Sequence, residues 1–594
     1  MSRIRSGLVA ACQLAFAVLA TATCKPPSCK AVPGTPGWPS AHDWQRFNVT
    51  LGGRLLQPKP PAAVCHTSGF GSTECQAVIN GWTKFEFHQQ DPVSVDWNNW
   101  TNDTCLPVVG APCSGQGYPV YVINATEPRH VQLGVKFAAK HNIRLVIKSS
   151  GHDFIGRSVA PNSLSIWTRH LSSVKPHASF RPRGCSAGKG PGSTTAVTVG
   201  GGTPMWDIYS GLDALNLTTV GGGAKSVSVG GYMTGGGHGI LSSRYGLAAD
   251  QVLEVELVTA NGEIITANAC QNQDLFWAVR GGGGSTFGVL TSATIRTFPT
   301  PQLSHAIVSI LTLNITDPRP IFDMTAYVLS KYPAMSDAGL SGYSFILRGT
   351  PIPPEFGNFT DVVGGFVFSG MALDSTPESL QAMWDPIFAH ISATWPGLFF
   401  TNIQTDSFPS FFAWFSVYYD ATPGGLNLRL GSRLLDSDAL TKDTAALSRA
   451  LETFTGAGAA NAHMVAGKGV HEAPAERISG MDNAVVPAWR KAYAHMISGT
   501  NFMPWNVTAR EEAKREVQRR VAALKALAPG MGAYVNEADP EEPDWQHAFW
   551  GSHYPRLLSI KRAVDPNDVF WCTPCVGNER WKEVGDRLCR VGGH

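Results

Sequence analysis

The pattern of apolar and polar positions between residues 118 and 150 predicts a strand, a helix and a second strand. Pro119–Ile123 is an apolar run of strand length, and Thr126–His141 has helical periodicity with Pro128 in its first turn. Arg144–Lys148 combines basic and β-branched residues in the period-two pattern of a half-buried strand. These segments predict a βαβ unit, and the loop after its second strand lies where open α/β sheets usually bind ligands.

That loop contains small, hydroxylated and charged residues that suit an anion such as a pyrophosphate. Small residues let backbone N–H groups approach the anion, hydroxyl groups add donors, and a lysine at the strand end adds positive charge. An imidazole beside a carboxylate follows at once, where the ring system of a cofactor would lie beyond its phosphates. The alternative is a surface turn in which the histidine only hydrogen-bonds the next aspartate. The candidate binding residues are Lys148, Ser149, Ser150, Gly151, His152, Asp153 and Ser158.

A second candidate binding segment, Gly221–Gly239, is too rich in glycine for an ordinary helix or strand. It follows a predicted strand at Val197–Val199 and a predicted helix at Met205–Leu215. A flexible linker would not carry apolar residues such as Val227 among its glycines, so we expect this backbone to press against a flat ring or a diphosphate. The residues expected to contact this ring or diphosphate are Ser226, Gly230, Gly231, Gly235, Gly236, Gly237 and Gly239.

Two further segments complete this half of the chain. Ser243–Ala267 predicts two strands joined at the Asn261-Gly262 hairpin signal. Asp274–Pro299 contains a run of glycines and, after it, Val289, which is a further candidate cofactor contact.

Residues 302–532 predict an α+β domain with an antiparallel sheet. Its last helix begins with an apparent capping box of Thr508 and Glu511 and ends before Pro529. One face of that helix carries Val517, Val521 and Leu524. The strand-like runs are His305–Leu313, Tyr343–Leu347, Val362–Phe368, Phe411–Tyr419 and Asn427–Leu430.

Size and charge narrow the class of protein. With 594 residues, of which 43% are hydrophobic, the chain is long enough for two domains, because single cores rarely exceed about 250–300 residues. The net charge of +2 with 15% charged residues gives no basic field, so we expect no nucleic-acid partner.

The N-terminus predicts export. Arg3 and Arg5 precede an apolar segment, and Ala20 and Ala22 form an A-x-A-like cleavage site, so residues 1–22 read as a signal peptide. No later run of about 20 apolar residues predicts a membrane span. We expect a secreted protein with N-linked glycans at Asn48, Asn99, Asn102, Asn124, Asn216, Asn314, Asn358 and Asn506.

The cysteine content fits an oxidising compartment. Twelve cysteines are present, and removing Cys12 with the signal peptide leaves eleven, so we expect structural disulfides and at least one unpaired thiol. Cys572 and Cys575 have the spacing of a thioredoxin-type redox motif. Their position near the C-terminus favours a structural disulfide over a redox role.

Taken together, the segments SSGHDFIGRS, Gly221–Gly239, Ser243–Ala267 and Asp274–Pro299, with YVNEADPEEPDW from Tyr534, resemble the vanillyl-alcohol oxidase and berberine-bridge-enzyme superfamily. The resemblance covers roughly residues 118–575. It implies a two-subdomain FAD-binding domain followed by an α+β substrate domain. In the family the histidine matching His152 is bonded to the 8α-methyl group of FAD. Many members attach FAD a second time through a cysteine, but Ala224 stands at that position here, so the resemblance implies a single covalent link through His152.

The domain division is predicted from composition at the N-terminus and, beyond it, from the predicted elements together with the resemblance. After the signal peptide we expect an N-terminal cap rich in cysteine and proline over residues 23–117, which is not part of the catalytic unit. The FAD-binding domain then covers residues 118–301 and the substrate domain residues 302–532, and residues 533–594 return to the FAD-binding domain.

The family's chemistry implies hydride transfer from a small-molecule substrate to FAD, with molecular oxygen reduced to hydrogen peroxide. We expect Tyr534 to accept the substrate proton and Asn536 to assist it, although Tyr534 serves equally well as a buried packing residue. Tyr418, Tyr419 and Arg433 are weaker candidates. No metal ion is expected.

Several functions remain open at this level. The first is a secreted oxidase of an alcohol or carbohydrate, and the second is a biosynthetic enzyme that desaturates or cyclises a secondary metabolite. A non-catalytic binding protein with the same fold and a thiol oxidoreductase acting through Cys572 and Cys575 are weaker alternatives.

Overall fold

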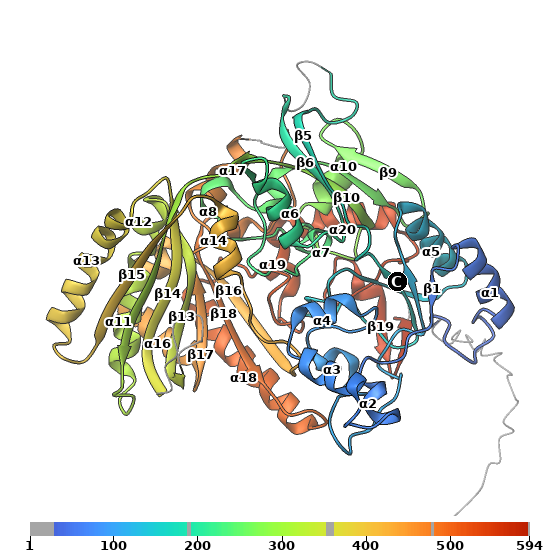
Figure 1. Ribbon diagram of the computed structural model, residues 1–594, viewed down its shortest axis with the longest axis horizontal. Coiled ribbons are helices and arrows are strands. Elements are labelled where there is room, and N and C mark those ends of the chain that lie inside the picture. The colour runs from blue at the N-terminus through green and yellow to red at the C-terminus, as the bar shows by residue number, and fades with distance from the viewer. Residues whose placement is uncertain (1–28, 187–191, 352–361, 477–479, 592–594) are drawn as a thin grey trace, which may run out of the picture.

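The computed structural model describes residues 29–186, 192–351, 362–476 and 480–591 (Figure 1). The expected signal peptide, Cys24 and the glycosylation sequon at Asn358 lie outside these ranges. Within them, no helix combines the length and apolar character needed to span a membrane.

A four-stranded sheet carries the predicted βαβ unit. Its strands are β1 (Leu55–Leu56), β2 (Tyr121–Asn124), β3 (Arg144–Lys148) and β4 (Ser163–Trp167), in the order β1-β2-β4-β3. Helix α5 (Pro128–Lys140) connects β2 to β3, as expected. The two strands are not neighbours, however, because β4 lies between them and pairs in parallel with both. The loop with His152 leaves the carboxyl end of β3.

A five-stranded antiparallel sheet forms the second half of this unit. Its order is β5-β6-β10-β8-β9, and the predicted hairpin is confirmed in β8 and β9. Its strands are β5 (Val174–Phe180), β6 (Thr194–Gly200), β8 (Val252–Val258), β9 (Ile264–Asn268) and β10 (Val289–Arg296). A small pair, β7 (Leu217–Thr218) and β11 (Phe298–Pro299), adjoins it. The associated helices are α6 (Met205–Asp213), α7 (Val229–Thr234), α8 (Ser242–Tyr245), α9 (Ala248–Gln251) and α10 (Gln273–Val279).

Two expectations for this region were wrong. The segment after Ser243 begins with helices α8 and α9 rather than a strand, since the Asp250 carboxylate accepts a hydrogen bond from the Leu247 backbone N–H and closes a turn there. The glycine-rich segment contains the short helix α7, which the glycine content alone argued against. Packing against neighbouring elements overrides the weak helix propensity of Gly230 and Gly231.

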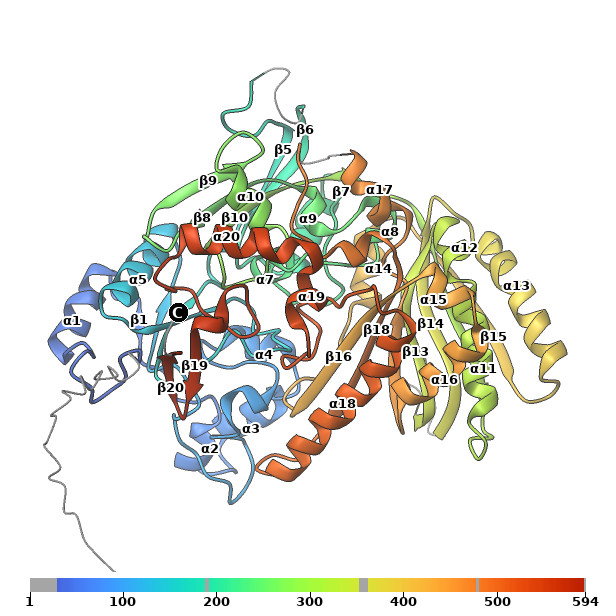
Figure 2. The ribbon, with the colours of Figure 1, turned by 180° about the vertical axis from the view of Figure 1, so that it is seen from behind.

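The α+β domain is built on a seven-stranded antiparallel sheet (left in Figure 1, right in Figure 2). Its order is β15-β12-β14-β13-β17-β18-β16. The strands are β12 (Leu303–Thr312), β13 (Leu340–Pro351), β14 (Val362–Leu373), β15 (Phe400–Phe408), β16 (Leu428–Asp436), β17 (Ala459–His463) and β18 (Ala492–Asn501). The helices are α11 (Arg319–Ser330), α12 (Tyr332–Asp337), α13 (Pro377–Thr394), α14 (Phe411–Tyr418), α15 (Ser437–Thr441), α16 (Thr444–Thr455), α17 (Lys468–Glu476) and α18 (Val507–Leu527), with a 3-10 turn at Pro487–Arg490.

Two local expectations in this domain were also wrong. The run Phe411–Tyr419 forms helix α14 and not a strand, and the Ser410 hydroxyl caps its N-terminus. Helix α18 begins at Val507, where the Asn506 side chain accepts the capping hydrogen bond, so Thr508 and Glu511 do not form a capping box. The apolar face of α18 is confirmed, because Val517, Val521 and Leu524 are buried in the core of this domain.

The N-terminal region is not a separate cap. It contains α1 (Ala41–Thr50), α2 (Ala63–Thr67), α3 (Thr73–Gly81), α4 (Phe85–Gln90) and a 3-10 turn at Asn98–Thr101. The ring of Phe47 in α1 stacks on Phe137 in α5 at 3.9 Å, and β1 extends the four-stranded sheet. This region therefore shares the core of the sheet that carries His152.

The C-terminal segment returns to the same unit, as expected. It contains α19 (Trp545–Trp550), α20 (Tyr554–Val564), β19 (Trp581–Val584), β20 (Arg587–Arg590) and short 3-10 turns at Gly551–His553 and Asn578–Arg580. Figures 1 and 2 show β19 near the sheet that contains β1, and α20 beside α10 of the five-stranded unit. The described cysteines form five disulfides, Cys29–Cys589, Cys65–Cys75, Cys105–Cys113, Cys185–Cys270 and Cys572–Cys575.

Candidate active site

A central cavity of about 700 Å³ lies where these parts of the chain meet, within the size range of small-molecule and cofactor sites. Its walls are the loop after β3, the glycine-rich segments around α7 and before β10, the turn at residues 534–537 and one face of the seven-stranded sheet. Phe85 and Trp97 from the N-terminal region complete it.

Alternation along the strands decides which residues of the sheet face the cavity. On β17, Asn461 and His463 line the cavity, whereas Ala460 and Ala462 are buried under the helices on the other face. On β13, Tyr343 lines the cavity in the same way. Successive side chains of a strand point to opposite faces, so this wall follows from the register of the sheet.

The predicted His152 lies at the wall of the cavity with two polar neighbours. Its Nε2 is 2.8 Å from Ser226 Oγ, and its Nδ1 is 3.2 Å from Asp96 Oδ2. Phe85 contacts the imidazole edge to face, with ring centroids 4.3 Å apart. Burial, with smaller contributions from His88 and Lys148, lowers the pKa of His152 from 6.5 to about 3. The imidazole is therefore neutral, and it does not form the local turn with Asp153 that was the alternative.

The sequence did not single out Asp96. Its side chain is fully buried, and neither carboxylate oxygen has a hydrogen-bond partner among the described residues. Burial raises the pKa of Asp96 well above its ordinary value. The expectation that residues 23–117 lie outside the catalytic unit is thus corrected, because this region supplies a group next to His152. Asp96 follows an apolar stretch with no recognisable motif, so the sequence held no signal for it.

Most of the loop after β3 lies where it was expected. Ser149, Ser150, Gly151, Asp153 and Ser158 all line the cavity, and the Asp153 carboxylate accepts a hydrogen bond of 2.5 Å from the Ser158 backbone N–H.

Lys148 does not face the cavity, contrary to the prediction that it contacts the cofactor. Its Nζ donates to the backbone oxygens of His88 and Asp91 at 3.0 and 2.8 Å, away from the cavity. Ile147, one position earlier on β3, lines the cavity instead, so strand alternation turns the charge of Lys148 to the opposite side.

The glycine-rich segment divides into two groups. Gly230 and Gly231 line the cavity with Val289. The other predicted glycines, Gly235, Gly236, Gly237 and Gly239, do not line it and pack against protein, and Ser226 reaches the site only through His152. At Gly239, for example, a Cβ would lie 1.9 Å from the Gly221 backbone oxygen. These glycines allow close packing beneath the cavity and do not face a ligand.

Tyr534 and Asn536 belong to a turn closed by a hydrogen bond from the Glu537 backbone N–H to the Tyr534 backbone oxygen. Asn536 Nδ2 donates to Tyr534 Oη at 2.8 Å and to the Gly231 backbone oxygen at 3.1 Å, while its Oδ1 accepts from Arg157 Nη2 at 2.7 Å. Both predicted residues line the cavity. Burial, with a smaller contribution from Glu537, raises the pKa of Tyr534 far above 10, so its phenol is neutral.

A histidine cluster that the sequence reading missed surrounds Glu537. His238 Nε2 and His495 Nε2 lie 3.1 and 2.9 Å from Glu537 Oε2. His463 is the register partner of His495 on the neighbouring strand. Glu537 directly follows Asn536, and His238 stands within the glycine-rich segment, so both lay inside motifs already recognised.

The three weaker candidates for the catalytic site differ in whether they line the cavity. Tyr418 and Tyr419, at the end of α14, line the cavity. Arg433 does not, since its Nη2 donates to the backbone oxygens of Ala528 and Pro529.

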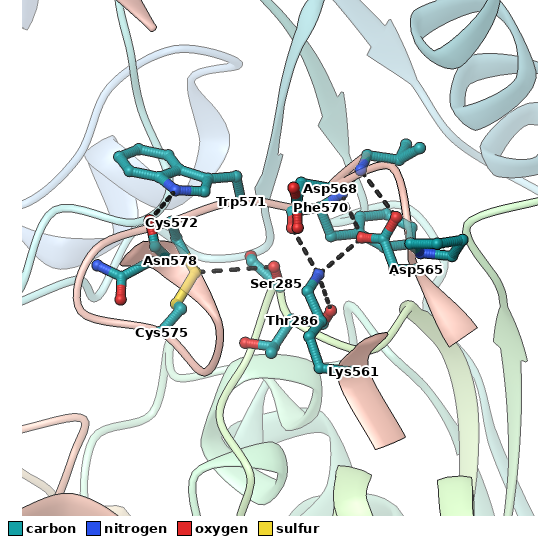
Figure 3. Close-up of polar contacts among 12 residues, drawn as sticks. Ser285, Thr286, Lys561, Asp565, Asp568, Phe570, Trp571, Cys572, Cys575 and Asn578 are labelled. Carbon is teal, nitrogen blue, oxygen red and sulfur yellow. Dashed lines mark hydrogen bonds and ion pairs between the residues drawn. A yellow bond between two sulfur atoms is a disulfide. The ribbon is translucent and has the colours of Figure 1, made fainter. Parts of the chain in front are cut away.

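The C-terminal segment supports the glycine run before β10 from behind (Figure 3). Lys561 forms a buried ion pair of 2.7 Å with Asp565 and donates to the Thr286 backbone oxygen at 2.8 Å. Cys572 Sγ lies 3.7 Å from the backbone oxygens of Gly284 and Ser285. The Cys572–Cys575 disulfide is buried and confirms the expected structural pairing.

The cavity lining fits a flavin dinucleotide. Arg157 Nη1 and Ser228 Oγ are buried without a hydrogen-bond partner, although both residues line the cavity. Buried polar groups are normally paired, so these atoms call for a polar ligand. Gly231 has no atom within 4 Å of the place where a Cβ would lie, which leaves room for a ring against its backbone.

Comparisons with known proteins agree with this site. Residues 119–268 match the family described as FAD binding domain, and residues 533–576 match the family described as berberine and berberine like. The bifunctional decalin synthase calF of Penicillium decumbens is 32% identical over 95% of this chain and 96% of its own. The VAO-type flavoprotein oxidase VAO615 of Thermothelomyces thermophilus is 32% identical over 95% of this chain and 96% of its own.

Among solved structures, the VAO-type flavoprotein MtVAO713 from Myceliophthora thermophila C1 superimposes with a TM-score of 0.87 at 30% identity, covering 95% of this chain and all of that one. Both the expected fold and the expected class of enzyme are therefore confirmed. The chain belongs to the FAD-linked oxidoreductases of the vanillyl-alcohol oxidase and berberine-bridge-enzyme type.

Proposed function

We propose that this chain is a secreted oxidase that takes hydride from a carbon bearing a hydroxyl group, in an alcohol, a carbohydrate or a related compound. FAD supplies the hydride acceptor when bound, and molecular oxygen is the final acceptor, giving hydrogen peroxide. The relative named as a flavoprotein oxidase supports this reading over a dehydrogenase.

The observation that carries the proposal is the environment of His152. A neutral imidazole at the cavity wall, next to a buried carboxylate 3.2 Å from Nδ1, suits a covalent bond to the cofactor. None of the described residues that line the cavity is a cysteine, and Ala224 occupies the position where a second link would form. A single bond through His152 is therefore proposed, which would retain FAD in dilute extracellular conditions.

The chain's own residues would bind the cofactor, orient the substrate and exclude water from the cavity. The loop after β3 and Gly231 would hold the cofactor, with Arg157 and Ser228 as polar contacts. Tyr534 and Asn536 form one hydrogen-bonded unit at the cavity wall, where they would orient the reacting group of the substrate. The apolar and aromatic wall, including Tyr343 and Tyr418, would exclude water from the reaction.

A peroxide screen over alcohols, sugars and phenolic compounds tests this function. We expect at least one class to bleach the flavin anaerobically and to yield peroxide in air, and flavin colour to stay with the protein after acid precipitation. Protein that lacks flavin, or flavin that no substrate of these classes reduces, would contradict the proposal.

The second candidate is a biosynthetic enzyme that oxidises a secondary metabolite to form a double bond or a ring. The relative named bifunctional decalin synthase favours it. Product analysis separates the two candidates, because a carbonyl product indicates alcohol oxidation and a new ring or alkene indicates the biosynthetic reaction.

Secretion and glycosylation are part of the proposal and rest on the N-terminal segment and the sequons. Asn102, Asn216, Asn314 and Asn506 are exposed and can accept glycans. Recovery of the protein from culture medium, with a mass that falls on treatment with an N-glycosidase, is the expected result.

A further inference from the structure

We propose that the Glu537 carboxylate, held by His238 and His495, accepts the hydroxyl proton that the substrate loses as its carbon gives up hydride. The substrates would then be neutral or cationic alcohols, because a second carboxylate beside Glu537 would be repelled. This inference rests on the proposed oxidase function and adds a proton acceptor and a substrate charge to it.

Geometry places the Glu537 carboxylate at the cavity. Oε2 is 3.1 Å from His238 Nε2 and 2.9 Å from His495 Nε2, and Oε1 is 3.2 Å from His238 Nε2. The side chain is 23% exposed, and Glu537 lines the cavity. The two imidazoles therefore fix the carboxylate while part of it stays open to a substrate.

The hydrogen bonding fixes the charge of this cluster. The Nδ1 atoms of His238 and His495 are buried and have no hydrogen-bond partner in the part of the chain that the structure describes. An unpaired acceptor costs less than an unpaired N–H at such a position, so each Nδ1 carries the lone pair and each Nε2–H donates to Glu537. Two neutral imidazoles then surround one carboxylate, and the cluster carries a single negative charge.

The same observation argues against a metal ion between these three side chains. Coordination through both Nε2 atoms would move each proton to Nδ1, where no partner in the described chain accepts it. Metal-bound histidines usually donate that second N–H to a carbonyl or carboxylate.

Among the titratable groups near the turn in the described chain, Glu537 is the one that carries a negative charge. Burial lowers the pKa of His463 to about 3, and burial raises the pKa of Tyr534 far above 10, so both groups are neutral. Arg157 already donates to Asn536. Burial raises the pKa of Glu537, but the hydrogen bonds from His238 and His495 hold it below its ordinary value, so Glu537 is the ionised group.

The reaction balances with oxygen as the oxidant. The substrate O–H bond breaks and its proton goes to Glu537, the C–H bond breaks and its electron pair leaves with hydrogen as hydride to the flavin, and the carbon–oxygen double bond forms. Hydride, the proton and molecular oxygen together give hydrogen peroxide, so one alcohol and one oxygen yield one carbonyl and one peroxide.

The test compares Glu537→Gln, Glu537→Asp and Tyr534→Phe in the flavin-loaded protein. The rate of anaerobic flavin bleaching by the best alcohol from the screen is measured between pH 5 and 9. We expect Glu537→Gln to lower that rate by about 100-fold or more with flavin content unchanged, and Glu537→Asp to recover part of it. We expect Tyr534→Phe to cost less than Glu537→Gln.

Several results would overturn the inference. One is a bleaching rate for Glu537→Gln within about threefold of the wild-type rate. Another is a smaller loss of bleaching rate for Glu537→Gln than for Tyr534→Phe. If Glu537→Gln does not load flavin, Glu537→Asp decides, and an inactive, flavin-loaded Glu537→Asp protein counts against the proposal. Stoichiometric metal in the purified protein that disappears in His495→Asn would also overturn it.

Failure of the oxidase function gives a different result. In that case wild-type protein itself shows no bleaching with any alcohol, whereas failure of the Glu537 role leaves wild type active. The substrate charge is checked with matched pairs, an alcohol and its carboxylate-bearing analogue. We expect the carboxylate-bearing analogue to bind to wild type more weakly than the alcohol does. In Glu537→Gln the affinity for the analogue should recover.

Discussion

The Asp96 carboxylate and the His152 imidazole face each other across 3.2 Å, although they come from different parts of the chain. Asp96 lies between β1 and β2, and His152 follows β3. Both are buried, so in the proposed covalent attachment the Asp96 side chain would be positioned to take the imidazole proton of His152.

Replacing Asp96 with Asn should therefore slow flavin attachment while leaving flavin binding intact. Asn keeps the shape of the side chain but cannot take the proton, so the attachment rate should fall by about 100-fold or more. The fraction of flavin retained by acid-precipitated protein, followed over time after adding FAD, measures this. His152→Ala should retain none, and Asp207→Asn, on the exposed side of α6, serves as the matched control. Equal attachment in Asp96→Asn and wild type would remove any role for the pair.

Gly231 and Gly239 should respond differently to alanine. A Cβ at Gly239 would overlap the Gly221 backbone oxygen, so Gly239→Ala should lower the free energy of unfolding by about 1–3 kcal/mol. A Cβ at Gly231 meets no protein atom within 4 Å, so Gly231→Ala should fold normally but bind less FAD. Thermal unfolding and the flavin-to-protein absorbance ratio measure the two effects. Full FAD loading of Gly231→Ala would show that this backbone does not face the cofactor.

Removing the Cys572–Cys575 disulfide should affect stability and not the type of reaction. Replacing both cysteines with serine removes a short covalent loop worth about 2 kcal/mol and loosens the support behind Gly284. Denaturant unfolding should show the loss, while the reaction catalysed stays the same. A selective loss of dithiol oxidation, with alcohol oxidation unchanged, would instead favour the thiol oxidoreductase alternative.

Glu542 gives a prediction for the dependence of stability on pH. Burial raises its pKa from 4.5 to about 7 in the folded chain, only partly opposed by Lys525. The folded state therefore binds this proton more tightly than the unfolded state between pH 4.5 and 7, and stability from this group falls as the pH rises through that window.

Glu542→Gln should remove the loss of stability that accompanies deprotonation of Glu542. At pH 8 the variant should be more stable than wild type by on the order of 2 kcal/mol, and the difference should shrink toward pH 4. Urea unfolding at several pH values measures it, with Glu512→Gln at an exposed position of α18 as control. A constant difference at all pH values would mean that Glu542 does not titrate in this range.

The recognisable motifs indicated which segments form the site. They indicated less about the direction in which individual side chains point. Ser149–Gly151, His152, Gly231, Tyr534 and Asn536 all line the cavity, because each belongs to a local motif whose backbone geometry is set by nearby residues. Lys148 was misplaced because a one-residue difference along a strand reverses the face to which a side chain points.

Contacts between distant segments could not be read in this way. Asp96 meets His152, and Glu537 meets His238 and His495, only after several elements pack together. The run Phe411–Tyr418 is apolar on all sides, so its pattern allowed a buried strand or helix, and its packing against α6 accompanies the helical form.

The sequence by itself thus determined the family, the fold class and the cofactor loops, since those depend on short-range glycine, turn and strand patterns. Only the tertiary structure decided the charge and hydrogen bonding of the site. A buried carboxylate or imidazole takes its protonation state from the groups around it, and those groups are brought together by folding and not by their order along the chain.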